Sequence, residues 1–268
     1  MQGAGLKGET MDEGYRRHVR TCNNAVLPGG RLAFRIGTAQ VGWVTPEFAA
    51  RLAGVPEFAT EPGAVVLHDG VALQPIARRL SEAGCYRWRR EAFDIRAESD
   101  GPVLAQLDRG ALPSFGVMAV GVHVNGLVRR PDGLHVWVAR RAANKLLDPS
   151  KLDHVVAGGV PAGLTPAETL VKEAEEEAAI PASLARQATE VGRITYAMER
   201  PEGLRRDLLY CYDLELPEDF TPRAADGEVE AFELWPIGRV MQTVRDSDDF
   251  KFNVNLVLID LFRRLQLI

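Results

Sequence analysis

Apolar and small side chains alternate most regularly between residues 115 and 128. One set of positions, from Val117 to Asn125, alternates with a second set, from Met118 to Val124. This two-residue period predicts a long β-strand with one set on each face. Residues 130–133 then predict a tight turn, and residues 134–139 are expected to form the returning strand of a hairpin.

Shorter apolar runs and the positions of proline predict the other elements. Strands are expected at residues 64–67, 92–95, 151–156, 190–198, 207–214 and 232–235. Helices are expected at residues 46–52 and 75–83, from Pro166 onward, and at 237–245 and 253–265. Because strands and helices alternate along the chain, the pattern favours the α/β class, with layers of helices on a mixed sheet.

The pattern also predicts how the chain is divided. Residues 1–14 are mostly polar and rich in glycine, which predicts a mobile tail. Residues 15–112 have a mixed pattern and are expected to form a smaller α+β domain. A turn-rich segment at 110–113 separates it from residues 113–268, where the pattern is more regular.

Composition and charge exclude several classes of protein. The chain has 268 residues, of which 46% are hydrophobic and 26% charged, and this rules out a disordered or low-complexity chain. Its 37 acidic and 32 basic side chains give a net charge of −5, so the field of the whole molecule does not attract nucleic acid. No apolar run approaches the roughly 18 residues that span a bilayer, and the N-terminus lacks a secretory signal. The three cysteines have no paired spacing, so we expect reduced thiols in a cytoplasmic protein.

Residues 157–180 carry the pattern that points most clearly to chemistry. Thr165, Pro166 and Glu168 predict a capping box with proline at the first helical position. One face of the helix that follows is apolar and is expected to pack on the core. Its members are Leu170, Val171, Ala174 and Ala178.

Three glutamates share another face of this helix: Glu173, Glu176 and Glu177. Like charges at this spacing cost roughly 0.2–0.5 kcal/mol per pair, and the C-terminal half of a helix disfavours negative charge. A divalent cation would offset this cost, since Mg²⁺ prefers oxygen ligands. Gly158 and Gly159, which come before the helix in a predicted loop, would let the backbone approach such an ion or a phosphate. The alternative is a solvated acidic helix face.

This segment resembles the Nudix box of the Nudix hydrolase family. The family motif is Gly, five residues, Glu, seven residues, and then Arg-Glu-apolar-x-Glu-Glu-x-Gly-apolar. Gly158 holds its first position, and residues 172–180 hold its second half. Three positions depart from the motif, with Leu164 for Glu, Lys172 for Arg and Ala179 for Gly.

The resemblance implies a Nudix α/β/α sandwich from about residue 113, preceded by a smaller α+β domain. It also implies hydrolysis of a diphosphate linkage with Mg²⁺, for which Mn²⁺ can substitute. Metal binding and catalysis are then expected from the helix glutamates, and further metal binding from the carbonyl group of Ala157. These glutamates are Glu173, Glu176 and Glu177. A fourth catalytic carboxylate is expected from the loop beside the last core strand, at Glu228 or, as second candidate, Glu230. The proton acceptor is either a helix glutamate or Glu228.

Basic residues after the hairpin are candidates for binding the substrate. Arg140, Arg141 and Lys145 follow it, and the arrangement favours Arg140 and Lys145 as ligands of a diphosphate. The alternative is an ordinary solvated basic turn. The other candidates for substrate binding lie in the segment that leads to the helix: Asp153, Gly158 and Gly159. Farther from this region, Arg87, Arg89 and Arg90 surround Trp88, which favours a domain interface or the rim of a substrate site over a nucleic-acid patch.

Several segments together resemble one Nudix subgroup, the proteins associated with thiamine pyrophosphokinase, which carry an extra N-terminal domain. These segments are residues 86–95, 115–126, 152–159, 226–234 and 249–264. The subgroup implies cleavage of (oxidised) thiamine diphosphate to the monophosphate. Two alternatives stay open: a general hydrolase of nucleoside diphosphate derivatives such as 8-oxo-dGDP, and a ligand-binding Nudix module without activity. The expected partner is a small-molecule diphosphate, with neither nucleic acid nor membrane. A homodimer stays open, because many relatives pair.

Overall fold

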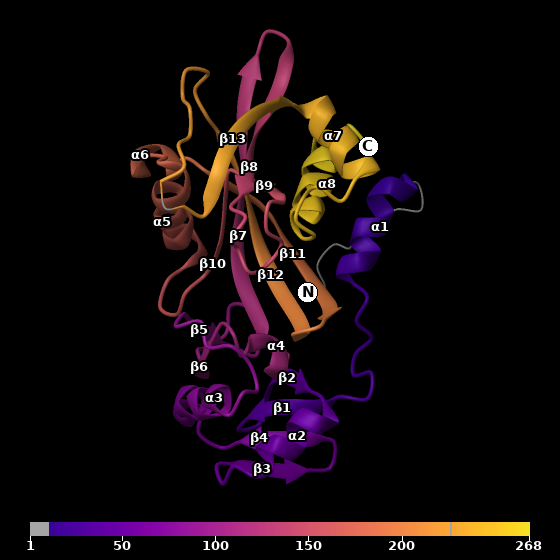
Figure 1. Cartoon of the computed structure of the whole chain (residues 1–268), viewed down its shortest axis with the longest axis vertical. Coiled ribbons are helices and arrows are strands. Elements are labelled where there is room, and N and C mark those ends of the chain that lie inside the picture. Colours follow the sequence, from indigo (N-terminus) through magenta and orange to yellow (C-terminus); the bar gives the residue numbers. More distant parts are fainter. Residues whose placement is uncertain (1–10, 226) are drawn as a thin grey trace.

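The computed structural model describes residues 11–225 and 227–268, so most of the predicted tail lies outside the described residues. The described chain forms two units that are stacked along the long axis of the molecule (Figure 1). The smaller unit contains a four-stranded sheet, and the larger unit contains a seven-stranded sheet. Within the described residues, no helix has the length and apolar character needed to cross a membrane.

The four-stranded sheet has the strand order β2-β1-β4-β3. Its strands are β1 (Leu32–Ile36), β2 (Ala39–Val44), β3 (Phe58–Glu61) and β4 (Ala64–Leu67). The smaller unit also contains α2 (Pro46–Leu52), the short 3-10 helix η1 (Gly70–Ala72), α3 (Leu73–Glu82), the antiparallel pair β5 (Ala92–Ile95) and β6 (Ala105–Asp108), and α4 (Leu112–Phe115). Thr45 caps α2, because its hydroxyl accepts a hydrogen bond from the Phe48 amide at 3.2 Å.

Aromatic rings form the centre of the smaller core. The ring of Phe115 lies 5.0 Å from the ring of Phe34 and 5.0 Å from that of Phe48, measured between centroids. Phe115 is fully buried, and Val117 belongs to the same core. Residues 115–117, which we expected at the start of a strand, therefore finish the smaller unit before the long strand begins.

The larger unit is built on a mixed sheet. Its main strand order is β11-β12-β7-β8-β13, with β10 paired to β7 and β9 paired to β8. The strands are β7 (Met118–Arg130), β8 (Gly133–Arg141), β9 (Leu152–His154), β10 (Val156–Gly159), β11 (Thr189–Arg200), β12 (Gly203–Glu215) and β13 (Val229–Pro236). β7 and β8 form the predicted hairpin, and β7 runs parallel to β12.

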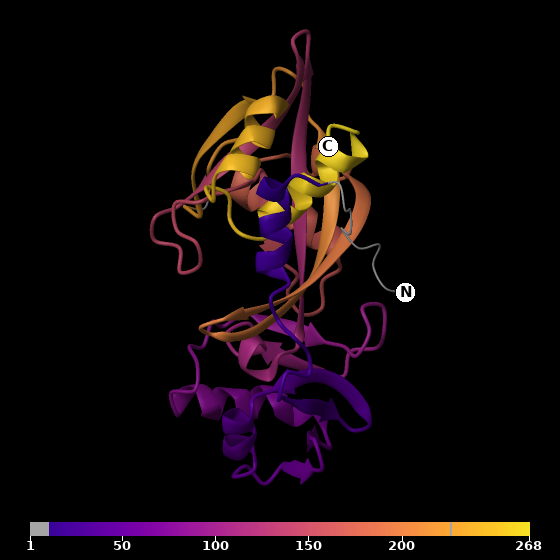
Figure 2. The ribbon, with the colours of Figure 1, turned by 90° about the vertical axis from the view of Figure 1, so that its right-hand side faces the viewer.

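Helices cover both faces of this sheet (Figures 1 and 2). On one face lie α5 (Pro166–Ala178) and α6 (Ala182–Ala185), and on the other lie α1 (Glu13–Cys22), α7 (Ile237–Asp246) and α8 (Val254–Arg264). Alternate residues of β8 serve the two layers: Trp137 packs in the core under α5, whereas Val136 and Val138 pack in the core under α7 and α8. The α/β/α sandwich and the mixed sheet are confirmed.

The first helix belongs to the larger unit, although it precedes the small sheet in the sequence. The buried imidazole of His18 lies 2.7 Å from the carbonyl oxygen of Val244 in α7. The ring of Tyr15 lies 6.1 Å from that of Phe262 in α8. Because α1 packs against the C-terminal helices, no single boundary in the sequence separates the two units.

The segment before α5 differs from the prediction. We expected one strand at 151–156 and then a glycine loop, but the structure has two strands, and both glycines lie in β10. Gly158 pairs with Val122 of β7, and Gly159 pairs with Gly121. The glycines serve close packing rather than a turn: a Cβ on Gly158 would lie 2.7 Å from Glu173 side-chain carbons, and a Cβ on Gly159 would lie 2.5 Å from the Phe93 ring.

Helix α5 ends at a residue whose backbone is left-handed. Ala179 has φ 53° and ψ 33°, a conformation that favours glycine. We expect Ala179→Gly to raise the free energy of unfolding by about 1 kcal/mol, as measured by urea denaturation. Ala178→Gly, one residue earlier in the helix, is the control and should lower that free energy by about 1 kcal/mol. Destabilisation by both changes would contradict this account.

Candidate active site

Helix α5 is oriented by its cap and its apolar stripe. The Thr165 hydroxyl accepts a hydrogen bond from the Glu168 amide at 3.2 Å, and the Glu168 carboxylate accepts one from the Thr165 amide at 2.9 Å. The predicted capping box is therefore present. Leu170, Ala174 and Ala178 are buried, so the stripe faces the core. With that rotation, Glu173 and Glu177 are directed toward β10.

Glu177 is a buried carboxylate at the centre of the region. Its side chain accepts a hydrogen bond from the Ala157 amide of β10 at 3.0 Å. Burial raises the pKa of Glu177 to about 8, although this hydrogen bond acts to lower the pKa. The negative charges of Asp153, Glu173 and Glu228 add to the rise in pKa, so four carboxylates act on one another here.

The other two helix glutamates are held by a lysine. The Lys172 ammonium group lies 3.4 Å from Glu173 and donates a shorter hydrogen bond to Glu176. Burial raises the pKa of the half-buried Glu173 carboxyl, whereas Glu176 is exposed. Lys172 thus occupies the motif position of arginine and keeps its positive charge next to the helix carboxylates.

The oxygen atoms of the three helix glutamates do not lie close enough together in this structure to bind one metal ion jointly. Among the described residues, one trio of potential ligand atoms lies within 4.8 Å of one another, and it consists of His123, Asp153 and His154. Two of the helix carboxylates pair with Lys172, and the third is directed to β10. The one carboxylate in this trio, Asp153, already pairs with the cations Arg141 and Lys251.

Five of the predicted site residues line one small cavity. They are Lys145, Asp153, Ala157, Glu177 and Glu228. The other lining residues are Ala139, Arg141, His154 and Val229. The Lys145 ammonium group donates a hydrogen bond to the Glu228 carboxylate, so a cation and an anion from two separate loops meet at this cavity. Burial alone would raise the pKa of Glu228, but Lys145 outweighs that effect and the pKa is lowered.

Arg140, which we favoured over Arg141, does not line this cavity, and its binding of a diphosphate stays a prediction. The Arg140 guanidinium donates to the Ser150 carbonyl at 3.2 Å on the other side of β8. Successive residues of a strand point to opposite faces, so Arg141 faces the cavity instead. Arg141 donates to Asp153 at 2.7 Å and to the carbonyl groups of Asp148 and Leu147 at 3.1 and 3.0 Å. It therefore shapes the loop that carries Lys145.

These contacts predict different effects for the two neighbouring arginines. Arg141→Ala should lower kcat/KM by at least ~10-fold and lower the melting temperature, because it leaves Asp153 with one fewer partner in a buried site. Arg140→Ala should leave both quantities within about a factor of two, since it removes a single exposed contact. Steady-state kinetics and thermal unfolding on the two variants test this, and equal losses would contradict the assignment.

Asp153 is the most strongly paired group of the site. Burial would raise the pKa of Asp153, but the charges of Lys251 and Arg141 outweigh it and hold the pKa well below its usual range. Lys251 lies 3.5 Å from the Asp153 carboxylate and is itself buried. Lys251 was not among the predicted site residues, although residues 250–252 resemble a subgroup motif expected to pack or to line the pocket. A signal was present, since it lies in one of the segments that resemble the thiamine-associated subgroup.

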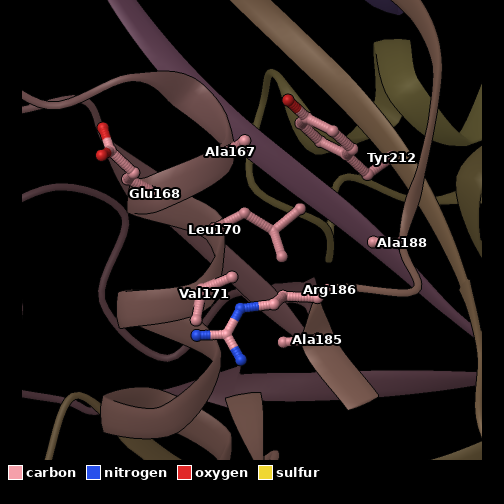
Figure 3. Close-up of a pocket in the computed structure, with 8 residues that line it drawn as sticks. All are labelled: Ala167, Glu168, Leu170, Val171, Ala185, Arg186, Ala188 and Tyr212. Carbon is pink, nitrogen blue, oxygen red and sulfur yellow. The ribbon is translucent and has the colours of Figure 1, made fainter. Parts of the chain in front are cut away.

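A second and wider pocket lies on the other side of α5 (Figure 3). It has about 780 Å³ of empty space and lies between α5, α6 and Tyr212 of β12. Leu170 and Val171 give it an apolar wall, and Figure 3 shows Arg186 extending along it. None of the predicted catalytic or metal-binding residues lines this pocket.

Comparison with known proteins accounts for this arrangement. The NUDIX domain model matches residues 120–254, about half of the chain. The chain belongs to the Nudix family. In this Nudix protein a second family model, described as a domain of unknown function (DUF4743), matches residues 14–119. The expected family and the mixed α/β fold with an N-terminal α+β domain are confirmed.

The Nudix protein is similar to two plant proteins and one yeast protein. Nudix hydrolase 20, chloroplastic, of Arabidopsis thaliana is 44% identical over 176 residues, which cover 65% of this chain and 47% of the relative. Nudix hydrolase 24, chloroplastic, of the same plant is 43% identical, with 65% and 48% covered. An uncharacterized protein of Saccharomyces cerevisiae is 30% identical, with 74% and 62% covered. The chain thus spans about half the length of the plant relatives.

Among solved structures, the Nudix protein is similar to a Deinococcus radiodurans protein at 22% identity and a TM-score of 0.49, covering 65% of this chain and 98% of that one. It is also similar to the Nudix domain of Shewanella oneidensis NrtR, crystallised with ADP ribose, at 14% identity and a TM-score of 0.45. That similarity covers 57% of this chain and 91% of the other.

Proposed function

We propose that this Nudix protein hydrolyses the diphosphate linkage of a small organic diphosphate with the help of Mg²⁺. The observation that carries the proposal is the buried Glu177 carboxylate on the Nudix helix. It shares its cavity with Glu228 and with the Lys145 cation. A carboxyl group whose pKa is raised by burial, and further by neighbouring carboxylates, is typical of a functional site.

The residues present suit a hard divalent cation. Glu177 and Glu173 offer carboxylate oxygens, Ala157 offers a backbone carbonyl oxygen, and Mg²⁺ prefers oxygen ligands. Burial, and then repulsion from neighbouring carboxylates, raises the pKa of Glu177, and a cation among these groups would offset both effects. Glu176 is exposed and paired with Lys172, so we place it at the solvent-facing edge of the metal site.

Each polar side chain of the cavity has a role in this proposal. Lys145 binds a phosphoryl oxygen, and Arg141 holds the loop that positions Lys145. Glu228 accepts the proton of the attacking water, because its lowered pKa keeps it ionised at neutral pH. When bound, the metal neutralises phosphate charge and lowers the pKa of that water.

For the substrate we propose thiamine diphosphate or its oxidised form, which is cleaved to the monophosphate. The support is the set of segments from residue 86 to residue 264 that resembles the subgroup associated with thiamine pyrophosphokinase. Nudix hydrolases act more broadly on nucleoside diphosphate derivatives, and this is the second candidate. A ligand-binding module without activity is the third, favoured by Leu164 where the motif has glutamate.

A substrate panel with mass detection of products tests the proposal. The full chain with Mg²⁺ or Mn²⁺ is given oxidised thiamine diphosphate, thiamine diphosphate, 8-oxo-dGDP and ADP-ribose. Fastest release of phosphate from the oxidised thiamine compound supports the specific proposal, and preference for 8-oxo-dGDP or ADP-ribose supports the broader one. Binding of these compounds without any product over hours would overturn the hydrolase and favour the binding module.

A further inference from the structure

The smaller unit contacts the Nudix site through its β5–β6 pair. The Ala162 amide, in the loop before α5, donates to the Ala92 carbonyl of β5 at 2.7 Å. The Gly163 amide donates to the Asp94 carboxylate at 3.2 Å. The Phe93 ring packs on Gly159, next to the glycine that contacts Glu173. One edge of the smaller unit is therefore fastened to the strand that carries the site.

A buried carboxylate fixes the backbone at this edge. Asp108 is fully buried and accepts hydrogen bonds from the amides of Arg89 and Gly110, both at 2.9 Å. The Arg109 amide donates to the Glu91 carbonyl at 2.7 Å, and the Arg109 guanidinium carbon lies 5.9 Å from the centre of the Phe93 ring. The backbone around Arg89 and Arg109 is thus fixed by the fold, and both side chains are exposed.

The charges at this edge are unbalanced. Arg87, Arg89 and Arg109 are exposed, and among the described residues neither Arg87 nor Arg89 has a carboxylate within 4.0 Å. Arg109 pairs with Glu91 at 2.8 Å, but its side chain remains 51% exposed and such a pair is worth little. Burial, and then the charges of Arg87 and Arg109, lower the pKa of Arg89. A bound anion would offset the mutual repulsion of these three cations.

One member of this set, Arg109, acts on the Nudix cavity across the boundary between the two units. After Lys145, the Arg109 charge is the next to lower the pKa of Glu228 against the effect of burial. Arg109 also acts on the buried Lys251. The cavity itself carries several carboxylates, which repel a diphosphate. Cations on the opposing unit offset that repulsion for a ligand that enters between them.

We propose that Arg89 and Arg109, together with Arg87, form an anion subsite through which the N-terminal unit binds a phosphoryl group of the diphosphate substrate. Guanidinium groups suit this ligand because their paired N–H donors match phosphate oxygens. The N-terminal unit then completes the active site. The proposal rests on the proposed hydrolase function, and it extends that function by assigning substrate binding to a domain of unknown function.

The test compares two charge-matched double variants of the full chain. Arg89→Gln/Arg109→Gln removes two cations of the subsite, and Arg35→Gln/Arg79→Gln removes two exposed cations that pair with Glu61 and Glu57 elsewhere on the same unit. Calorimetry measures binding of inorganic pyrophosphate with and without Mg²⁺ at low salt, and steady-state kinetics measure kcat and KM. Thermal unfolding checks that both variants fold, as expected when only side chains outside the Asp108 hydrogen bonds change.

The subsite variant should raise the pyrophosphate Kd and the substrate KM at least ~10-fold, with kcat changed less than about threefold, because charged hydrogen bonds are lost. The control variant should match the wild type. If the wild type hydrolyses its substrate and the subsite variant has the same Kd and KM, the subsite is overturned and the hydrolase stands. If pyrophosphate binding depends on the two arginines but no substrate is cleaved, the subsite stands and the hydrolase fails. A wild type that binds no pyrophosphate overturns the subsite.

Discussion

Replacement of Glu177 by glutamine is expected to lower turnover of the diphosphate substrate by a factor of about 10²–10³ or more, with the fold intact. The amide has the size of the carboxylate and can still accept the hydrogen bond from the Ala157 amide. It carries no negative charge, so it cannot help to hold a divalent cation. Phosphate release by the purified variant at saturating Mg²⁺ measures the effect, and unchanged release would refute the assignment of Glu177.

The same variant should change how stability depends on pH. Burial raises the pKa of Glu177 from its ordinary value of 4.5 to about 8, so the folded protein favours the protonated acid. In metal-free protein this contribution is fully present below about pH 4.5 and is lost as the pH rises through 8. The loss is roughly 1.4 kcal/mol for each pH unit between the two pKa values.

Urea unfolding at several pH values without metal measures this dependence. Wild type should lose stability between about pH 5 and 8, and Glu177→Gln should lose much less. Addition of Mg²⁺ should restore the wild type at pH 8, because the cation stabilises the ionised form of Glu177. Parallel curves for the two proteins would show that Glu177 does not titrate as its burial requires.

Replacement of Asp153 by alanine is expected to lower the free energy of unfolding by about 3–5 kcal/mol. This carboxylate lies between Arg141 at 2.7 Å and Lys251 at 3.5 Å, and all three side chains are largely buried. Its removal leaves two largely buried cations together without their anion. The His154 amide also loses its acceptor on Asp153, at 2.9 Å.

Chemical denaturation measures this loss, and the control is Asp132→Ala in the exposed turn of the β7–β8 hairpin. The Asp132 side chain is 72% exposed, so the control should change stability by less than about 0.5 kcal/mol. A double variant, Asp153→Ala/Lys251→Met, should recover part of the loss because it also removes one of the unpaired cations. A loss as small as that of the control would mean that the three charges do not stabilise the folded state.

Helix α5 shows which features the sequence could predict. The capping box of Thr165 and Glu168 and the apolar stripe both follow from contacts within one or two helical turns. The Nudix box could be found for the same reason, since its spacing lies within a single helix and the strand before it. The hairpin of β7 and β8 was likewise predictable from a local alternation and a four-residue turn.

Other parts of the site depended on pairing between distant segments. Arg140 and Arg141 are equivalent in sequence, and the register of β8 decided that Arg141 faces Asp153 while Arg140 faces Ser150. Gly158 and Gly159 looked like a loop, but pairing with β7 made them a strand. A strand register involves residues far apart in the chain, so no local pattern reveals it.

By itself, the sequence determined the main secondary-structure elements and the chemistry of the Nudix helix, because both depend on neighbours within a few residues. Only the tertiary structure decided which charges meet: Lys145 with Glu228, Lys251 with Asp153, and Arg109 with the cavity from the other unit. Each of these pairs joins segments about 80 to 120 residues apart. Their interaction exists only once the sheets and helices have packed, since charge attraction acts over a few ångströms and is screened in the open chain.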